Sequence, residues 1–274
     1  SLRVEYFGRI WNDRELPWHY PWFYFIVTVP LVLHVLGIAG LVRGWRTRRE
    51  DPFPGLLAAS ILLFLLLFST RAPVYDGERL FLLVFPAWAM LIGLGFQRTW
   101  ERWGASATGR RLLVGLLACQ AFGTLSMHPF GLSYYNLLVG GLAGAERLGM
   151  EPTYWGDAVD RVLLDDLASR IQPGETVALV PTLYPGQGTA TTTASLLRKD
   201  VVIQDESAVV GADWVLISRR RAYWPVVLTR RLEDGSGRMV ASRARQGVWL
   251  SALWNFSKSP KPTPGAGRVR EESR

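Results

Sequence analysis

The chain has 274 residues, of which 49% are hydrophobic and 12% aromatic, and its net charge is +8, from 31 Lys and Arg against 23 Asp and Glu. A basic balance is one signature of nucleic-acid binding, but much of the positive charge lies in short breaks between apolar segments, so we expect no nucleic-acid partner. A single cysteine, Cys119, excludes an internal disulfide.

The first half of the chain contains four apolar segments that are candidates for membrane spans. A helix that crosses a bilayer needs about 17–25 apolar residues, so the last two segments are short, and a buried core helix is their alternative interpretation. Four such segments in a row, separated by arginine-rich breaks, favour a multi-pass α-helical membrane domain over residues 21–127, with about four transmembrane helices. The segments are Trp22–Val42, Phe53–Thr70, Leu80–Phe96 and Leu112–Met127.

The breaks between the segments predict their orientation. Cytoplasmic loops carry an excess of Lys and Arg. Two breaks are rich in arginine, the first with Arg43, Arg46, Arg48 and Arg49 and the last with Arg98, Arg102, Arg110 and Arg111. With these loops in the cytoplasm, the juxtamembrane segment 1–20, the loop 69–79 and everything after residue 127 face outside. We therefore expect both ends of this chain to be extracytoplasmic.

Two short segments of this predicted outer face carry chemistry. LPWHYPWFY, residues 16–24, is an aromatic belt of the kind that anchors a protein at an interface, and His19 beside Tyr20 is the part that anchoring does not require. Arg79 stands at the mouth of the third apolar segment, after Asp76 and Glu78. Its planar guanidinium suits a lipid phosphate. The alternative is an arginine that reaches to the interface and pairs with a neighbouring acid.

The third segment is the junction that follows the last apolar segment, residues 128–156. It combines aromatic residues, paired glycines, one histidine and one asparagine. The rings of Tyr134 and Tyr135 are of a kind that stacks on sugars or seals an interface, and His128 and Asn136 add polar groups. A structural lid between the membrane and the following domain is the alternative.

Residues 157–256 alternate between helical and strand patterns, which predicts a small α/β domain of about 100 residues, enough for its own core. Apolar spacing predicts a helix over 157–171 with Asp157 as its N-cap. A loop at 185–188 leads into a helix that ends near Arg198, and residues 257–274 have the composition of a disordered tail. The predicted strands are 176–180, 201–203, 214–218, 238–244 and 247–254, the last two forming a hairpin around Gln246 and Gly247.

Two other motifs in this half are weak. PGQGTATTT, residues 185–193, lacks the spacing and the lysine of a Walker motif. SRRRAYW, residues 218–224, is interpreted as facing solvent rather than anionic headgroups. The sequence shows neither a cluster with metal-ligand spacing nor a Ser-His-Asp arrangement, so we expect no metal and no cofactor.

Three stretches together resemble the C-terminal half of bacterial GT-C glycosyltransferases, in particular glycosyltransferase family 39, similar to dolichyl-phosphate-mannose protein mannosyltransferases. They begin LPWHYPWFY at residue 16, YDGERLFLLVFP at residue 75 and HPFGLSYYN at residue 128, the last ending in YWGDA. The resemblance covers most of residues 16–160 and, more loosely, the α/β domain. It implies an enzyme of the bacterial inner membrane that transfers a sugar, with inversion, from a polyprenyl-phosphate donor to an extracytoplasmic acceptor.

The family's catalytic carboxylate lies in its first outer loop, upstream of anything in this chain, so we assign no catalytic residue. The chain begins with Ser, and we expect a fragment that is inactive without its N-terminal half. The resemblance implies donor or substrate binding by Arg79, Asp76, His19, Tyr20, His128, Tyr134, Tyr135 and Asn136. Membrane lipid and a lipid-linked sugar are the expected partners. A non-catalytic membrane protein whose outer α/β domain binds a partner or an envelope glycan is the alternative.

Overall fold

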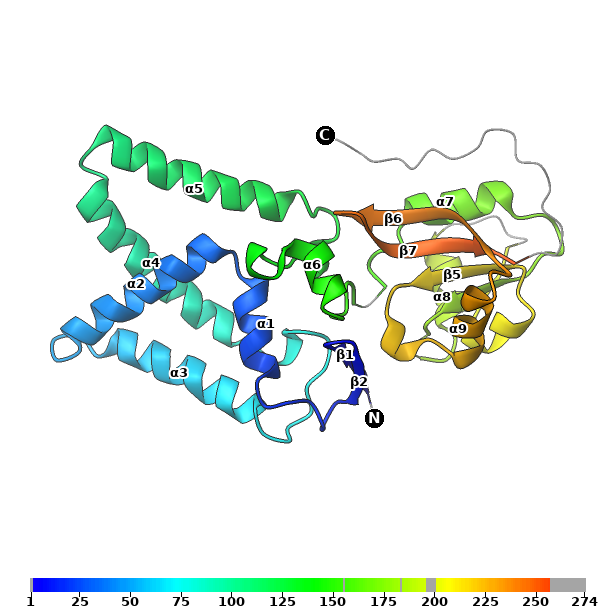
Figure 1. Ribbon diagram of the computed structural model, residues 1–274, viewed down its shortest axis with the longest axis horizontal. Coiled ribbons are helices and arrows are strands. Elements are labelled where there is room, and N and C mark those ends of the chain that lie inside the picture. Colours follow the sequence, from blue (N-terminus) through cyan, green and yellow to red (C-terminus); the bar gives the residue numbers. More distant parts are fainter. Residues whose placement is uncertain (1, 155, 183, 196–200, 257–274) are drawn as a thin grey trace. The chain divides into compact units, whose positions relative to one another are not determined.

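A computed structural model describes the chain except for residues 1, 155, 183, 196–200 and 257–274. The chain divides into two compact units, residues 1–150 and residues 151–274. The first unit is helical with a small hairpin, and the second is built on a mixed β-sheet (Figure 1). The predicted tail and the predicted helix end near Arg198 lie outside the described residues.

The first unit begins with an antiparallel hairpin in which Tyr6 pairs with Arg9. Helices joined by short turns follow it. In chain order the elements are β1 (Arg3–Tyr6), β2 (Arg9–Asn12), α1 (Tyr20–Thr28), α2 (Leu31–Thr47), α3 (Phe53–Phe68), η1 (Arg79–Phe81), α4 (Val84–Trp103), α5 (Ala107–Leu125), η2 (Gly131–Ser133), η3 (Leu137–Val139) and α6 (Gly141–Arg147).

The prediction of a membrane domain with about four transmembrane helices is wrong. In the described part of the chain, no single helix combines the length and the apolar composition that a bilayer crossing requires. Among the described helices, α1 and α2 alone meet the test as a pair, and they are bent by 111° at the break between them. Helix boundaries explain the error. Helix α3 ends after 16 residues, α4 continues past Arg98 and Arg102, and α5 starts before Arg110 and Arg111.

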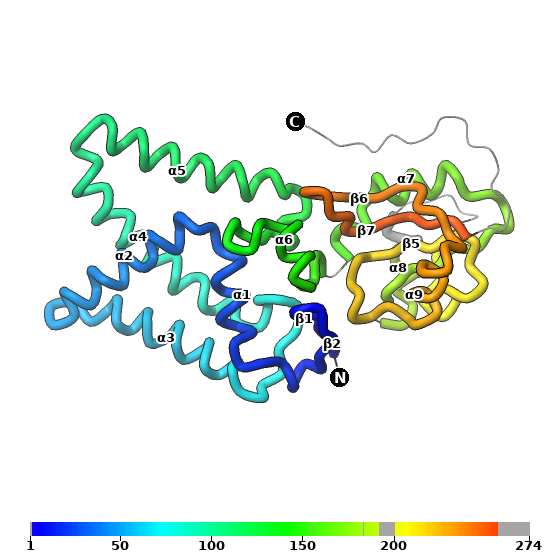
Figure 2. The backbone as a smooth tube through the Cα atoms, viewed as in Figure 1, coloured from blue at the N-terminus to red at the C-terminus, as the bar shows by residue number. Residues whose placement is uncertain are grey.

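The bend between α1 and α2 lies at Val29 and Pro30 (Figure 2). Proline disfavours the helical conformation in the residue before it, and Val29 is extended, with φ −96° and ψ 135°. Other side chains bind the carbonyl groups that the break releases. The Asn136 amide donates to the carbonyl oxygens of Ile26 and Val29, both at 2.7 Å, and Nε2 of His34 lies 3.1 Å from that of Ile26. The break is therefore a stabilised part of the fold.

Helices α2 and α4 approach each other through glycines. A Cβ atom added at Gly40 would collide with the carbonyl oxygen of Leu91, and one added at Gly95 would collide with that of Leu36. Only a residue without a side chain permits such an approach of two backbones. The packing of the helical unit thus depends on small residues at this crossing.

The second unit contains a five-stranded sheet in the order β4-β3-β5-β7-β6. Strand β3 is parallel to β4 and β5, whereas β7 is antiparallel to β5 and β6. The elements are α7 (Arg161–Arg170), β3 (Val177–Val180), α8 (Gln187–Ser195), β4 (Ile203–Gln204), η4 (Glu206–Val210), β5 (Trp214–Ser218), η5 (Arg221–Tyr223), α9 (Val226–Glu233), β6 (Arg238–Arg245) and β7 (Val248–Asn255).

Each face of the sheet carries its own core. Side chains of α7 pack with Leu179 and Leu216 on one face. On the other face, Leu228 of α9 packs with Val180 and Ile217. Successive residues of a strand point to opposite faces, which is why Leu216 and Ile217 belong to different cores. The unit therefore has three layers, helix, sheet and helix.

The strand 214–218 and the terminal hairpin are confirmed. In the turn of the hairpin, Gln246 and Gly247 both have positive φ, 48° and 76°, which suits a two-residue connection. The predicted N-cap is wrong. Helix α7 begins at Arg161, and the carboxylate of Asp160 accepts a hydrogen bond from the Leu163 amide at 3.1 Å. Asp157 lies outside the helix.

Candidate functional site

The turn that leads into η1 brings two predicted site residues together. Asp76 and Gly77 both have positive φ, 57° and 63°, a conformation that Asp adopts more readily than most residues. The chain reverses there and places Arg79 Nη1 3.3 Å from Asp76 Oδ2. The side chain of Asp76 is 8% exposed, whereas that of Arg79 is 44% exposed. Asp76 thus holds the guanidinium at one point, and part of the Arg79 side chain remains exposed.

The two predicted residues before the bend lie at the start of α1. Tyr20 is fully buried, and its hydroxyl lies 3.5 Å from the carbonyl oxygen of Gly77. This contact links α1 to the turn that holds Asp76 and Arg79. His19 lies beside the ring of Tyr6, at 5.7 Å between ring centroids, and Tyr6 also meets Tyr20 edge-on at 5.0 Å. Burial raises the pKa of the Tyr6 phenol. The structure therefore assigns Tyr20 a packing role and leaves His19 partly exposed.

The junction residues have separate surroundings. Tyr135 is buried and its ring meets that of Tyr24 on α1 at 6.3 Å. Asn136 is also buried, and its side-chain amide donates to the carbonyl oxygens at the bend between α1 and α2. Burial raises the pKa of the Tyr134 phenol, and a hydrogen bond with the Thr124 side chain partly opposes that shift. His128 is exposed after the end of α5. The junction is thus mainly a packing segment of the helical unit.

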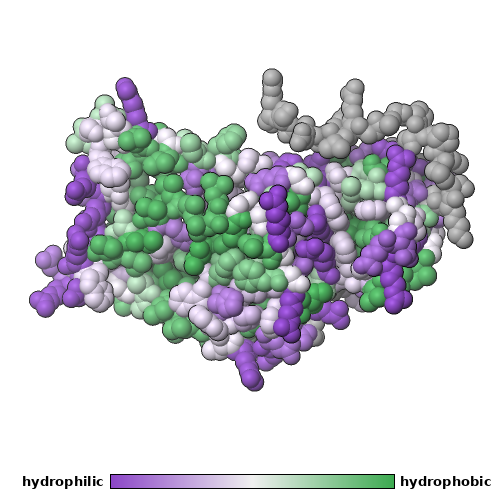
Figure 3. Space-filling model, in the orientation of Figure 1, coloured by the Kyte–Doolittle hydropathy of each residue, from purple (hydrophilic) through white to green (hydrophobic). Residues whose placement is uncertain are grey.

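Exposed apolar side chains follow Arg79 along the chain. Leu82 and Leu83 follow η1 directly, and both are exposed. Across the helical unit many large apolar side chains lie on the surface, and Figure 3 shows them gathered over its helices. Apolar surface and a partly exposed cation thus both occur in this unit.

The α/β unit contains a pocket that the sequence did not indicate. It has a volume of about 140 Å³ and lies where β3 and β5 end. The prediction that residues 218–224 face solvent is wrong for Ser218 and Arg220, which are buried. Arg220 Nε lies 3.8 Å from Oε1 of Glu151, which is also buried. The three consecutive arginines in the sequence did not indicate that Arg220 is buried, because its partner Glu151 precedes the whole sheet in the chain.

The backbone amides of the glycine-rich loop 185–188 bind a carboxylate of the protein itself. The amides of Gly186 and Gly188 donate to the two carboxylate oxygens of Asp205, at 2.6 and 2.7 Å. An internal carboxylate therefore takes the place that a phosphate has in a nucleotide-binding loop. Among the described residues, no group of three or more His, Cys, Asp or Glu is placed to hold a metal ion.

Compared with family models, with curated proteins and with solved structures, the chain shows no match. The resemblance to glycosyltransferase family 39 rests on the three sequence stretches and stays a prediction.

Proposed function

We propose that this chain is part of a glycosyltransferase that takes a sugar from a polyprenyl-phosphate donor, and that Arg79 binds the donor phosphate. One observation carries the proposal. The half-exposed guanidinium of Arg79 is held by Asp76 and is followed along the chain by the exposed Leu82 and Leu83. A guanidinium forms paired hydrogen bonds with a phosphate, and an apolar surface gains free energy by covering the prenyl chain.

The role of Asp76 follows from this geometry. Water reaches the half-exposed guanidinium and screens its interaction with Asp76, so the same guanidinium can also bind a phosphate. The largely buried carboxylate stays in place and keeps the guanidinium oriented while the phosphate binds.

A binding experiment on the chain tests the phosphate contact. Farnesyl phosphate and farnesol share the prenyl chain and differ in the phosphate. We expect the chain to bind farnesyl phosphate more tightly than farnesol, and Arg79→Ala to weaken only the binding of the phosphate by about 10- to 100-fold, as expected for a charge-assisted contact. Arg79→Lys keeps the charge but loses the paired geometry, so we expect an intermediate affinity.

Arg71→Ala is the matched control, because Arg71 is an exposed arginine of the same loop. It is expected to bind farnesyl phosphate like the wild type. In the larger enzyme, Arg79→Ala should raise the KM for the lipid donor more than it lowers the amount of protein. If Arg79→Ala binds farnesyl phosphate as well as the wild type does, Arg79 is an interfacial anchor and the proposal fails.

A further inference from the structure

The pocket of the α/β unit lies at a reversal of strand order. From β3 the chain enters α8 and returns as β4 on one side, and from β5 it continues through η5 and α9 to β6 and β7 on the other side. The carboxyl ends of β3 and β5 therefore flank a crevice, which is the usual place for a ligand in an open α/β sheet. The cavity of about 140 Å³ is found there. Water occupies about 30 Å³ per molecule in the liquid, so the pocket has room for a small solute.

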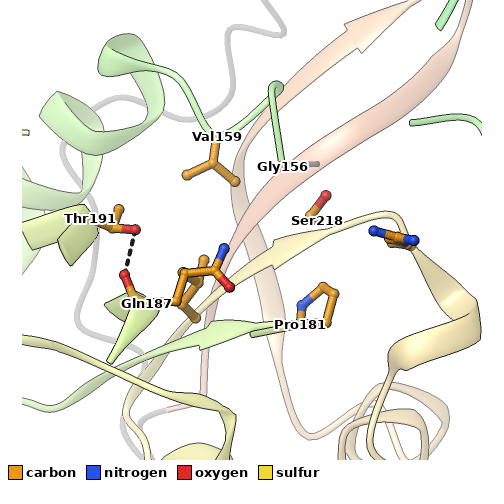
Figure 4. A pocket seen from close by; sticks show the side chains of 8 residues that line it. Gly156, Val159, Pro181, Gln187, Thr191 and Ser218 are labelled. Carbon is orange, nitrogen blue, oxygen red and sulfur yellow. Dashed lines mark hydrogen bonds between the residues drawn. The ribbon is translucent and has the colours of Figure 1, made fainter. Parts of the chain in front are cut away.

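Ser218 supplies an observation that points to a ligand. It ends β5, is only 4% exposed and lines the pocket. Its Oγ atom has no hydrogen-bond partner among the described residues. Figure 4 shows Ser218 in the pocket wall between Gly156 and Pro181, with Val159 and Gln187 around the same space. A buried hydroxyl without a partner costs free energy, and a ligand that enters the pocket removes this cost.

The charges around the pocket favour a neutral ligand. The positive charge of Arg220 lies beside the carboxylate of Glu151, with both side chains almost completely buried. The guanidinium also stacks over the ring of Tyr223, 4.5 Å from its centroid. The neighbouring loop amides are already bound to Asp205. An anion would thus meet a compensated cation and occupied donors, so neither feature selects for it.

The other polar side chains of the pocket are suited to hydrogen bonds with the hydroxyl groups of a ligand. Ser218, Thr191 and the Gln187 amide are neutral and can each donate and accept hydrogen bonds. The Thr191 hydroxyl donates to the backbone carbonyl of Gln187 at 2.9 Å, which leaves its oxygen able to accept. Val159 and Pro181 provide apolar walls. Such a mixture fits a ring whose edge carries hydroxyls and whose faces are apolar.

We propose that this pocket binds a neutral, hydroxyl-rich molecule of the size of one sugar ring, with Ser218 Oγ hydrogen-bonded to a ligand hydroxyl. The site belongs to the α/β unit, and its argument does not depend on the phosphate contact of Arg79. The carrying observation is a buried hydroxyl in the pocket wall that has no hydrogen-bond partner among the described residues.

Saturation-transfer NMR on the 274-residue chain tests the proposal. The probes are D-mannose, D-glucose and myo-inositol, with inorganic phosphate as the anionic comparison, and any detergent present must lack a sugar headgroup. We expect at least one of the three polyols to bind and phosphate not to compete with it. Ser218→Ala should weaken that binding about 5- to 10-fold, as expected for the loss of one hydrogen bond. Because the wild-type hydroxyl has no partner in the part of the chain that the structure describes, the thermal stability of Ser218→Ala without ligand should equal that of the wild type.

Ser251→Ala is the matched control. Ser251 is fully buried in the adjacent strand, and its hydroxyl donates to the carbonyl oxygen of Ala158. Its replacement should lower thermal stability and leave polyol affinity unchanged. Thr191→Val removes a second pocket hydroxyl and should also weaken binding, whereas Arg79→Ala should not. The proposal is overturned if no polyol binds to the wild type, if phosphate displaces the bound polyol, or if Ser218→Ala binds it unchanged.

Discussion

The leucines of α3 and those of α7 differ in how many of them are buried. On α3 one stripe, Leu57, Ile61 and Leu65, is buried, while further leucines such as Leu63 lie exposed on its other faces. On α7 the leucines face the sheet and charged residues occupy the outside. A helix that is apolar on all sides needs a cover on all sides. The α/β unit therefore encloses its own core, whereas the helical unit exposes many large apolar side chains.

The largest expected difference between the two units is the loss of stability when one leucine of each is replaced by alanine. Leu216 in β5 is 0% exposed and Leu63 in α3 is 63% exposed. Leu216→Ala removes a fully packed side chain and should lower the free energy of unfolding of the α/β unit by about 2–5 kcal/mol. Leu63→Ala should change the stability of the helical unit by less than about 0.5 kcal/mol. Hydrogen exchange on peptides from each unit measures the two effects separately.

The outcome for Leu63 decides the interpretation. A cost comparable to that of Leu216→Ala would mean that the outer face of α3 is packed against protein in solution. If Leu63→Ala leaves the hydrogen-exchange protection of the helical peptides equal to that in Leu216→Ala, the side chain of Leu63 is exposed in solution as described.

Prediction from the sequence succeeded where local pattern sets the structure. The strand at 214–218 and the turn at Gln246 and Gly247 follow from alternation and turn chemistry, and the structure has both. A pairing of Arg79 with a neighbouring acid was the alternative interpretation of that residue, and Asp76 lies within reach of it because only two residues separate them. In contrast, hydropathy averaged over a segment cannot say where a helix starts or breaks, which is why the predicted spans failed.

The rest depends on partners distant in the chain. The side chain of Asn136 is used at a bend more than a hundred residues upstream, so its polar character suggested a binding role that the contacts do not require. The burial of Arg220 depends on Glu151, which precedes the whole sheet. Neither relationship leaves a local pattern, and a single sequence therefore cannot reveal it.

Two glycines of α4 are expected to differ in how much their replacement by alanine changes the stability of the helical unit. A Cβ at Gly95 would collide with the backbone of α2, whereas one at Gly93 would meet no atom within 4 Å. We expect Gly95→Ala to destabilise the helical unit by about 1–3 kcal/mol, because the opposing atom is backbone and cannot move aside easily. Gly93→Ala should be neutral or stabilising by up to about 1 kcal/mol, because alanine favours the helix.

Circular dichroism during urea unfolding and hydrogen exchange of α2 and α4 peptides report the difference between these two variants. Equal behaviour of Gly93→Ala and Gly95→Ala would show that α2 and α4 do not cross as closely as described.

The smallest expected effect is a pH dependence in the α/β unit, centred on Asp157. Burial raises the pKa of its carboxyl group above the ordinary value of 3.8, and hydrogen bonds, first among them that from Thr153, oppose the shift. The folded state therefore holds the proton more tightly than the unfolded state does. Its contribution to stability is complete below the unfolded pKa and is lost as the pH rises through the folded pKa.

We therefore expect the wild type to lose stability relative to Asp157→Asn as the pH rises from about 4, with the loss complete once the folded carboxyl has ionised. Thr153→Val removes the main hydrogen bond that favours the charged form, so it should raise the pKa of Asp157 further and extend the window upward. Urea midpoints of the three proteins across this pH range measure the effect. A gain of wild-type stability over Asp157→Asn with rising pH would mean that the carboxylate is stabilised when charged, and that the entrance to α7 is less buried than its contacts indicate.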